Sequence, residues 1–277
     1  PGESWCVAGS NRSGIRPFFD LVSGRLEPSA AVQVDRPEKI GRVSFKDQQD
    51  IYEQELKNDD TDYLDRLDPG TPARDFLSDA PAHQSLIDRF ALTDCLDQGY
   101  RQLSTGQTRK LLILSMITQG HDFLVLQAPF EGLDRAGFME LGQALEYLSL
   151  QGHSLILFVH NPEDIPAWCS HLAWMDKGRI ALQGARETVG GQIHQQMGQA
   201  EADFNASAKE VFGPCRQRRN TPDDALVCLK NGSAGYGGKP VFDGVDLMIR
   251  PGMHTLITGA NGCGNAGCQP LQVIKHC

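Results

Sequence analysis

The residues of this chain with the clearest chemical meaning form a glycine-bearing loop near its start. Gly9-Ser10-Asn11-Arg12-Ser13-Gly14 follows an apolar run over 5–8 and precedes a helical pattern over 15–22. Glycines spaced in this way let successive backbone N–H groups converge on phosphate oxygens. Such a loop also needs a lysine for the β- and γ-phosphates and a hydroxyl for Mg²⁺, but Ile15 and Arg16 occupy those positions. The candidate nucleotide-binding residues here are Gly9, Ser10, Asn11, Ser13 and Gly14. An ordinary glycine turn is the alternative.

A second loop of the same layout lies 250 residues further along the chain. A strand-like run over 255–258 leads into Gly259-Ala260-Asn261-Gly262-Cys263-Gly264. Asn265 and Ala266 stand where the lysine and the Ser or Thr would be expected. The two loops match with almost no gap, which predicts an internal repeat. The candidate nucleotide-binding residues of this loop are Gly259, Asn261, Gly262 and Gly264.

Alternating strand and helix patterns surround the first loop and indicate an α/β sheet. Apolar runs over 123–126 and 154–159 are typical of parallel strands that are covered on both faces. Helices are expected over 86–92, 135–150 and 184–205, with an amphipathic helix over 108–118. Strands are expected over 41–45, 226–229 and 245–249, and a hairpin over 172–183. The acidic, turn-rich residues 46–82 are expected to form a solvated surface insertion.

Three further motifs come after the first loop in a fixed order. Leu103-Ser104-Thr105-Gly106-Gln107 lies about 90 residues after it and directly before the expected helix over 108–118. Pro129-Phe130-Glu131-Gly132-Leu133-Asp134 follows the strand over 123–126, and His160 follows the strand over 154–159. This ordered set resembles the ATP-binding cassette (ABC) ATPase family.

The resemblance implies a role for each motif. In the family, the serine and glycine of the signature, here Ser104 and Gly106 with Gln107, face a γ-phosphate across a dimer from a helix N-terminus. Asp134 lies in the segment that matches the D-loop, and His160 stands in the place of the switch histidine. Tyr236 matches the adenine-stacking aromatic of the second repeat. The resemblance thus implies ATP and Mg²⁺ as cofactors.

More narrowly, the chain resembles the tandem-cassette proteins described as molybdenum-transport or photorepair ATP-binding proteins. The features that carry this are Gly2-Glu3-Ser4-Trp5, residues 103–110, residues 129–134 and Asp164-Ile165-Pro166. The resemblance covers nearly the whole chain up to Gly264. It implies a P-loop NTPase-like ABC nucleotide-binding domain with a helical subdomain over about 70–118, plus a truncated start of a second cassette. The implied parts are a first cassette over 1–205 without its N-terminal strands, a linker over 206–224, and the N-terminal fragment of a second cassette over 225–277.

The departures from the family's pattern fall on its catalytic groups. Gln127 and Ala128 stand where the family has a magnesium-linked Asp and a Glu that polarises the attacking water. A neutral amide lacks the carboxylate charge, and an alanine cannot act as a base. ATP hydrolysis is therefore expected to be severely impaired. The candidate catalytic residues are His160 and Asp134, and no metal ligand is predicted. The family's magnesium-contacting glutamine would fall near Gln48 or Gln49.

Composition limits the partners and the location. The 277 residues include 26 Lys and Arg against 35 Asp and Glu, a net charge of −9, which argues against broad contact with nucleic acid or anionic lipid. We see no apolar run long enough to insert in a membrane and no signal peptide. The eight cysteines are scattered, which favours a reducing cytoplasm. A peripheral place at the inner membrane face would need a membrane transport subunit or a second cassette as partner.

Three functions stay open at this point. The first is an ATPase coupled to a transport partner, and the second is a pseudo-ATPase that binds nucleotide or serves only as a scaffold. The third is a decayed copy, favoured by the tail over 265–277, which has no helical pattern. Structural roles also stay open for the motif residues. Ser104 and Asp134 could be helix caps, Tyr236 a turn residue and His160 an ordinary strand-end histidine.

Overall fold

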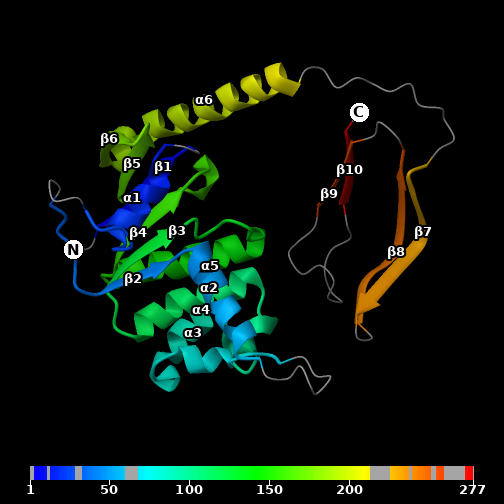
Figure 1. The fold of residues 1–277 in the computed structure, drawn as a ribbon, viewed down its shortest axis with the longest axis horizontal. Helices are drawn as coiled ribbons and strands as arrows, with labels where there is room; N and C mark the ends of the chain where they lie inside the picture. Colours follow the sequence, from blue (N-terminus) through cyan, green and yellow to red (C-terminus); the bar gives the residue numbers. More distant parts are fainter. Residues whose placement is uncertain are drawn as a thin grey trace. The chain divides into compact units, whose positions relative to one another are not determined.

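The computed structural model describes residues 3–10, 13–28, 33–59, 68–212, 225–236, 239–250, 254–258 and 272–276 (Figure 1). Contacts divide the chain into two compact units, residues 1–205 and 206–277. The helices are α1 (Ile15–Val22), α2 (Phe45–Lys57), α3 (Gln84–Arg89), α4 (Thr105–Thr118), α5 (Arg135–Leu150) and α6 (Arg186–Phe212). The strands are β1 (Ser4–Gly9), β2 (Ile40–Val43), β3 (Phe123–Gln127), β4 (Ser154–Val159), β5 (His171–Asp176), β6 (Arg179–Ala185), β7 (Val227–Tyr236), β8 (Lys239–Ile249), β9 (His254–Thr258) and β10 (Gln272–His276).

The first unit is built on a six-stranded sheet in the order β2-β3-β4-β1-β5-β6. The strands β2, β3, β4, β1 and β5 are parallel to their neighbours, and only β6 is antiparallel, to β5. In a parallel sheet the carboxyl ends of the strands meet at one edge, where ligands of such folds bind. The loop after β1, the segment after β3 and His160 after β4 therefore share this edge.

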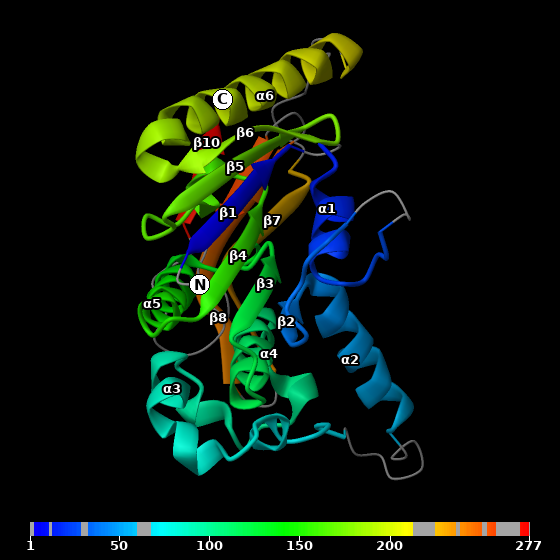
Figure 2. The ribbon, with the colours of Figure 1, turned by 90° about the vertical axis from the view of Figure 1, so that its left-hand side faces the viewer.

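Both faces of the sheet are covered, because the apolar side chains of each strand alternate between two layers. Figure 2 shows α1 on one face and α5 on the other. The α1 face buries Val7, Ile15, Phe19, Val125, Phe158, Ala173 and Met175. The opposite face buries a larger cluster that includes Cys6 and Leu157 of the sheet, Ile113 of α4, Leu145 of α5 and Ile193 of α6. The strands are continuously apolar because both faces of the sheet are covered, as the sequence predicts.

The expected α/β fold of the first unit is confirmed, and many of its elements lie where the sequence indicates. Strand β4 and helix α5 have the predicted bounds, and β5 and β6 form the predicted hairpin. Short helical segments and α3 fill the range between Ala73 and Gln102, ahead of α4. Helix α6 runs on to Phe212, into the range expected to be a linker. None of the described helices is both long and apolar enough to cross a bilayer.

Three expectations about local structure are wrong. Residues 46–57 are not part of a turn-rich insertion but form α2, because Ser44 and Asp47 make a capping box that starts a helix. The same cap ends β2 at Val43, two residues before the expected strand end. Helix α4 is not amphipathic in its setting, since every residue over 108–115 is buried between the sheet and the helical segments.

Among the described residues of the second unit are the end of α6 and two antiparallel strand pairs, β7 with β8 and β9 with β10. Strand β10 lies in the tail for which the sequence shows no helical pattern. The expected loop residues Gly259, Asn261, Gly262 and Gly264 lie outside the described residues, as does Asn11 of the first loop.

The aromatic contacts of Phe158 yield a stability prediction. Phe158 is 1% exposed and packs edge-on against Phe19 and Phe18, with ring centroids 5.4 Å and 5.9 Å away. Replacing Phe158 by alanine should lower the free energy of unfolding by about 3–5 kcal/mol, since it opens a cavity between the sheet and α1. Urea unfolding measures the change. Leu150→Ala, at a position that is 78% exposed, is the control and should change stability by less than about 0.5 kcal/mol. Similar effects of the two variants would contradict the layered core.

Candidate functional site

The first glycine loop connects the end of β1 to the start of α1, as predicted. Gly9 ends the strand, and Gly14 is the N-cap of the helix, with a φ of 89°. The Ser13 N–H donates to the Ser10 carbonyl over 3.0 Å, and the Phe18 N–H donates to the Gly14 carbonyl over 3.1 Å. The left-handed backbone at Gly14 is one that glycine adopts without strain. The backbone thus has the strand–loop–helix form that a phosphate-binding loop requires.

Close packing also fixes the two glycines of this loop. A Cβ atom at Gly14 would lie 2.8 Å from the Cα atom of Gly178, in the turn between β5 and β6. The Gly178 N–H donates to the Ser13 carbonyl over 2.7 Å. A Cβ atom at Gly9 would lie 2.5 Å from Ser13 Oγ. Gly14 is therefore needed for the shape of the loop whether or not a ligand is bound, whereas a side chain at Gly9 would first displace the Ser13 hydroxyl.

The position of the missing lysine is filled by a buried apolar side chain. Ile15 is 4% exposed and belongs to the cluster with Val7, Phe158 and Met175 on the α1 face. It brings no positive charge to the start of α1, and Arg16 next to it is exposed. One polar group does fit an anion, since Ser13 Oγ is buried and has no hydrogen-bond partner. The described residues of the loop therefore offer backbone and hydroxyl donors to a phosphate, but no cation stands at the position of the lysine.

His160 joins the ends of β4 and β1. Its Nδ1 atom lies 3.1 Å from the carbonyl oxygen of Gly9. A carbonyl only accepts, so Nδ1 must carry a proton, and in the neutral ring Nε2 is then an acceptor. His160 in this arrangement donates a hydrogen bond to a phosphate oxygen only when it is doubly protonated.

The carboxyl end of β3 carries no carboxylate. Gln127 is its last residue, and Ala128 follows with a φ of 45°, held by hydrogen bonds to Phe158 and Glu131. In the part of the chain that the structure describes, no group of three His, Cys, Asp or Glu side chains could hold a metal ion. Mg²⁺ prefers carboxylate and other oxygen ligands. Gln127, Ala128 and the exposed Arg16 do not fit the Mg²⁺ of an ATPase site.

The signature motif forms the start of α4. Ser104 Oγ accepts from the Gln107 N–H over 3.2 Å, and Gln107 Oε1 accepts from the Ser104 N–H over 2.8 Å, which makes a reciprocal cap. Gly106 lies close to the segment after β3, because a Cβ atom there would be 2.8 Å from Leu133 Cδ2. Ser104 and Thr105 are exposed, so this helix N-terminus is accessible to solvent.

A buried arginine that the sequence pattern did not reveal fastens α4 to the segment after β3. Arg109 is 4% exposed and donates to the carbonyl oxygens of Pro129 and Glu131 over 3.1 Å and 2.5 Å. Burial lowers the pKa of its guanidinium. The available signal was the charged pair Arg109-Lys110 at the start of an apolar helix, where a charge must find buried partners. Lys110, next to it, forms an ion pair with the Glu140 carboxylate of α5.

Asp134 acts as the N-cap of α5. Its Oδ1 atom accepts from the Gly137 N–H over 2.8 Å. The residues predicted for the site thus fall into two groups, Gly9, Ser10, Ser13, Gly14 with His160, and Ser104, Gly106, Gln107 with Asp134. Hydrogen bonds join Gly9 to His160 in the first group and Ser104 to Gln107 in the second. Tyr236 is the last residue of β7 in the second unit.

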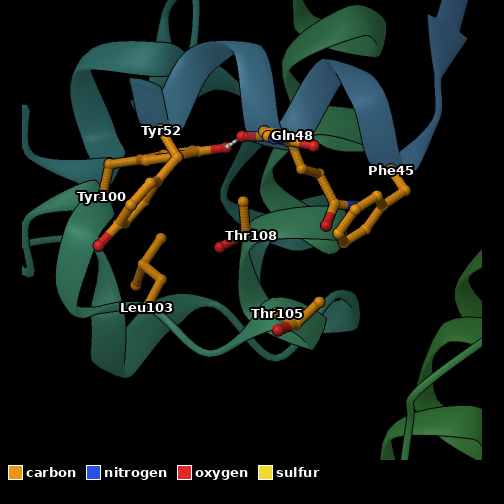
Figure 3. A pocket seen from close by; sticks show the side chains of 8 residues that line it. Phe45, Gln48, Tyr52, Tyr100, Leu103, Thr105 and Thr108 are labelled. Carbon is orange, nitrogen blue, oxygen red and sulfur yellow. Dashed lines mark hydrogen bonds between the residues drawn. The ribbon is translucent and has the colours of Figure 1, made fainter. Parts of the chain in front are cut away.

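Gln48 and Gln49, the candidates for a magnesium-contacting glutamine, lie in α2. They line a pocket with Thr105 and Thr108 at the start of α4 (Figure 3). Gln49 Nε2 donates to Glu53 over 2.9 Å, on the exposed side of α2.

The chain is similar to ABC transporter ATP-binding proteins of known sequence, although no protein-family model matches it. It is 28% identical over 282 residues to the ABC transporter ATP-binding protein ModF of Escherichia coli, which covers 99% of this chain and 58% of ModF. It is 26% identical over 251 residues to the uncharacterized ABC transporter ATP-binding protein YhaQ of Bacillus subtilis, over 88% of this chain and 76% of YhaQ. This chain thus spans little more than half the length of ModF.

Solved structures of ABC cassettes share the fold. The cbiO1 protein of Clostridium perfringens, part of the ABC transporter complex cbiONQ, superposes with a TM-score of 0.51 at 22% identity, over 69% of this chain and 81% of that one. An ATP-binding cassette of an ABC transporter in its ADP conformation superposes with a TM-score of 0.51 at 14% identity, over 70% of this chain and 84% of that one. The loop after β1, the capped signature helix and these relatives agree: the chain is similar in sequence to ABC transporter ATP-binding proteins and shares the fold of ABC cassettes.

Proposed function

We propose that this protein is an ABC-family nucleotide-binding protein whose ATP hydrolysis is severely impaired. This proposal is supported by a contrast at the carboxyl edge of the sheet, between the loop backbone, which is kept, and the charged residues, which are replaced. The loop from Gly9 to Gly14 keeps the backbone of a phosphate site, whereas Ile15 is buried in an apolar cluster and β3 ends in Gln127 and Ala128. Phosphoryl transfer depends on positioning and electrostatic stabilisation, and the groups that supply the charge are the ones replaced.

Weak nucleotide binding is compatible with the groups that stay in place. The N–H groups at the start of α1 and the unpartnered Ser13 Oγ can donate to phosphate oxygens. Without a lysine or carboxylates, this binding gains nothing from Mg²⁺. ATP would therefore act as a bound ligand that changes the state of the loop, and this chain would serve as a regulatory or scaffolding half.

The proposal includes a tandem arrangement with a transport assembly. The similarity to ModF extends over 99% of this chain, which supports the assignment of residues 225–277 as the start of a second cassette after a first cassette over 1–205. A second cassette or a membrane transport subunit is the partner class of this proposal, in the cytoplasm. Molybdenum transport, expected from the sequence resemblance, is its most specific form and is supported by the 28% identity to ModF.

A calorimetric titration of ATP tests nucleotide binding. We expect a Kd on the order of 1 mM, unchanged within about twofold when EDTA replaces Mg²⁺, because the site lacks the lysine and the carboxylates that would bind Mg²⁺-ATP. Ser13→Ala should weaken binding by about threefold to tenfold, since it removes only a hydroxyl that has no partner in the protein. Ser78→Ala, at an exposed position, is the matched control. Binding that is much tighter with Mg²⁺, or phosphate release that His160→Ala abolishes, would contradict the proposal.

Restoring the lysine tests how the loop and the core are linked. Ile15→Lys should lower the free energy of unfolding by about 3–5 kcal/mol without ligand, because it places an uncompensated charge in the apolar cluster. ATP should restore part of that loss, since its phosphates can pair with the ammonium group. Ile15→Met, of similar volume, should cost less than about 1.5 kcal/mol and show no larger ATP effect than the wild type. Urea unfolding with and without ATP provides both readouts. Equal stability of the Lys and Met variants would show that Ile15 does not lie in the packed core.

A further inference from the structure

A pocket between α2 and the start of α4 lies outside the loop proposed to bind ATP. It has a volume of about 250 Å³. Its lining residues are Phe45, Gln48, Gln49, Tyr52, Tyr100, Leu103, Thr105 and Thr108. All eight are uncharged, and three of them are aromatic. Figure 3 shows the side chains converging from α2, the turn around Tyr100 and the first turns of α4.

The pocket contains a buried polar group that lacks a partner. Gln48 is 5% exposed, and its Nε2 atom has no hydrogen-bond partner. In Figure 3 the Gln48 side chain extends from α2 between Phe45 and Thr108. A buried amide without a partner costs free energy, so an acceptor supplied from outside would be favoured there. By contrast, the backbone carbonyl of Gln48 is already satisfied by the Tyr100 hydroxyl over 3.2 Å.

The aromatic side chains that line the pocket indicate which kind of ligand would fit beside the acceptor. Phe45 is 62% exposed and Tyr52 is 43% exposed, so both rings face solvent at the pocket. Tyr100, in contrast, is 2% exposed and fixed by its hydrogen bond to Gln48. Aromatic rings at such a site stack on flat, apolar partners. The lack of Lys, Arg and His among the lining residues disfavours a phosphate or carboxylate ligand.

We propose that this pocket binds a small, uncharged, planar heteroaromatic compound that offers a carbonyl or ring-nitrogen acceptor to Gln48 Nε2. A cavity of roughly 150 Å³ holds a benzene ring, so this pocket has room for two fused rings. Thr105, at the first position of the signature helix, lines the pocket and places its occupant beside the start of α4. The ligand would thus act at a site separate from the loop after β1.

The test uses isoquinolin-1(2H)-one, a fused bicyclic lactam, and naphthalene, which has the same shape but no acceptor. Ligand-observed NMR titration of the full chain should give a Kd of about 0.1–1 mM for the lactam, a range typical of ligands this small. Naphthalene should bind at least about fivefold more weakly, because it leaves Gln48 Nε2 unpaired. Phenyl phosphate should not compete.

Gln48→Leu is the decisive variant. It should weaken the lactam by about fivefold to tenfold and leave naphthalene unchanged or tighter. Gln54→Leu, on the exposed side of α2, is the matched control and should change neither. Tyr52→Ala, at an exposed position that does not threaten folding, should weaken both compounds. An unchanged lactam affinity in Gln48→Leu, equal affinities for the two compounds, or no binding of either would overturn the proposal.

Discussion

Covering a parallel sheet with helices on both faces leaves little room for chemistry except at the carboxyl ends of its strands. Val7 and Val125 pack under α1, while Cys6 and Leu124 pack on the opposite face, so every inner strand is apolar on both sides. At the sheet itself, polar function is therefore confined to the segments directly after β1, β3 and β4. The loop at Gly9, the end of β3 at Gln127 and His160 all lie at this edge. The layered core thus decides where phosphate-binding and catalytic groups can lie on this sheet.

The loop after β1 illustrates how a binding loop and a core can compete for one residue. A lysine at position 15 would need a phosphate to compensate its buried charge. Ile15 instead packs in the apolar layer with Phe158 and Met175. The chain therefore gains packing at the start of α1 and loses a cation at the same point. Ser13 Oγ remains in the loop as a buried hydroxyl without a hydrogen-bond partner.

Strong periodicity made much of the fold predictable. Helix α5 and strand β4 have the predicted bounds because long apolar patterns with clear punctuation leave few alternatives. Helix α2 was missed because its sequence is acidic and polar, and only the Ser44–Asp47 capping box marks its start. Helix α4 was expected to have one polar face, yet Arg109 and Lys110 are buried with partners from the segment after β3 and from α5.

The candidate site was only partly predictable from sequence, since hydrogen bonds between distant residues give no local pattern. The motif order placed Gly9, Ser104 and His160 in the correct elements, but not the bond from His160 to the Gly9 carbonyl. The role of Arg109 and the pocket at Gln48 depend on which elements meet in space, and neither has a motif.

The close packing of Gly14 against Gly178 shows that a glycine in a loop of this kind can be required for a structural reason. A side chain at Gly14 would collide with the backbone of the β5–β6 turn, and one at Gly9 would collide with Ser13. The backbone contact at Gly14 alone is enough to require a glycine there, whether or not the loop takes part in turnover. The glycine spacing of a phosphate loop is therefore a record of ancestry, and the charged residues around it are the better indicators of present activity.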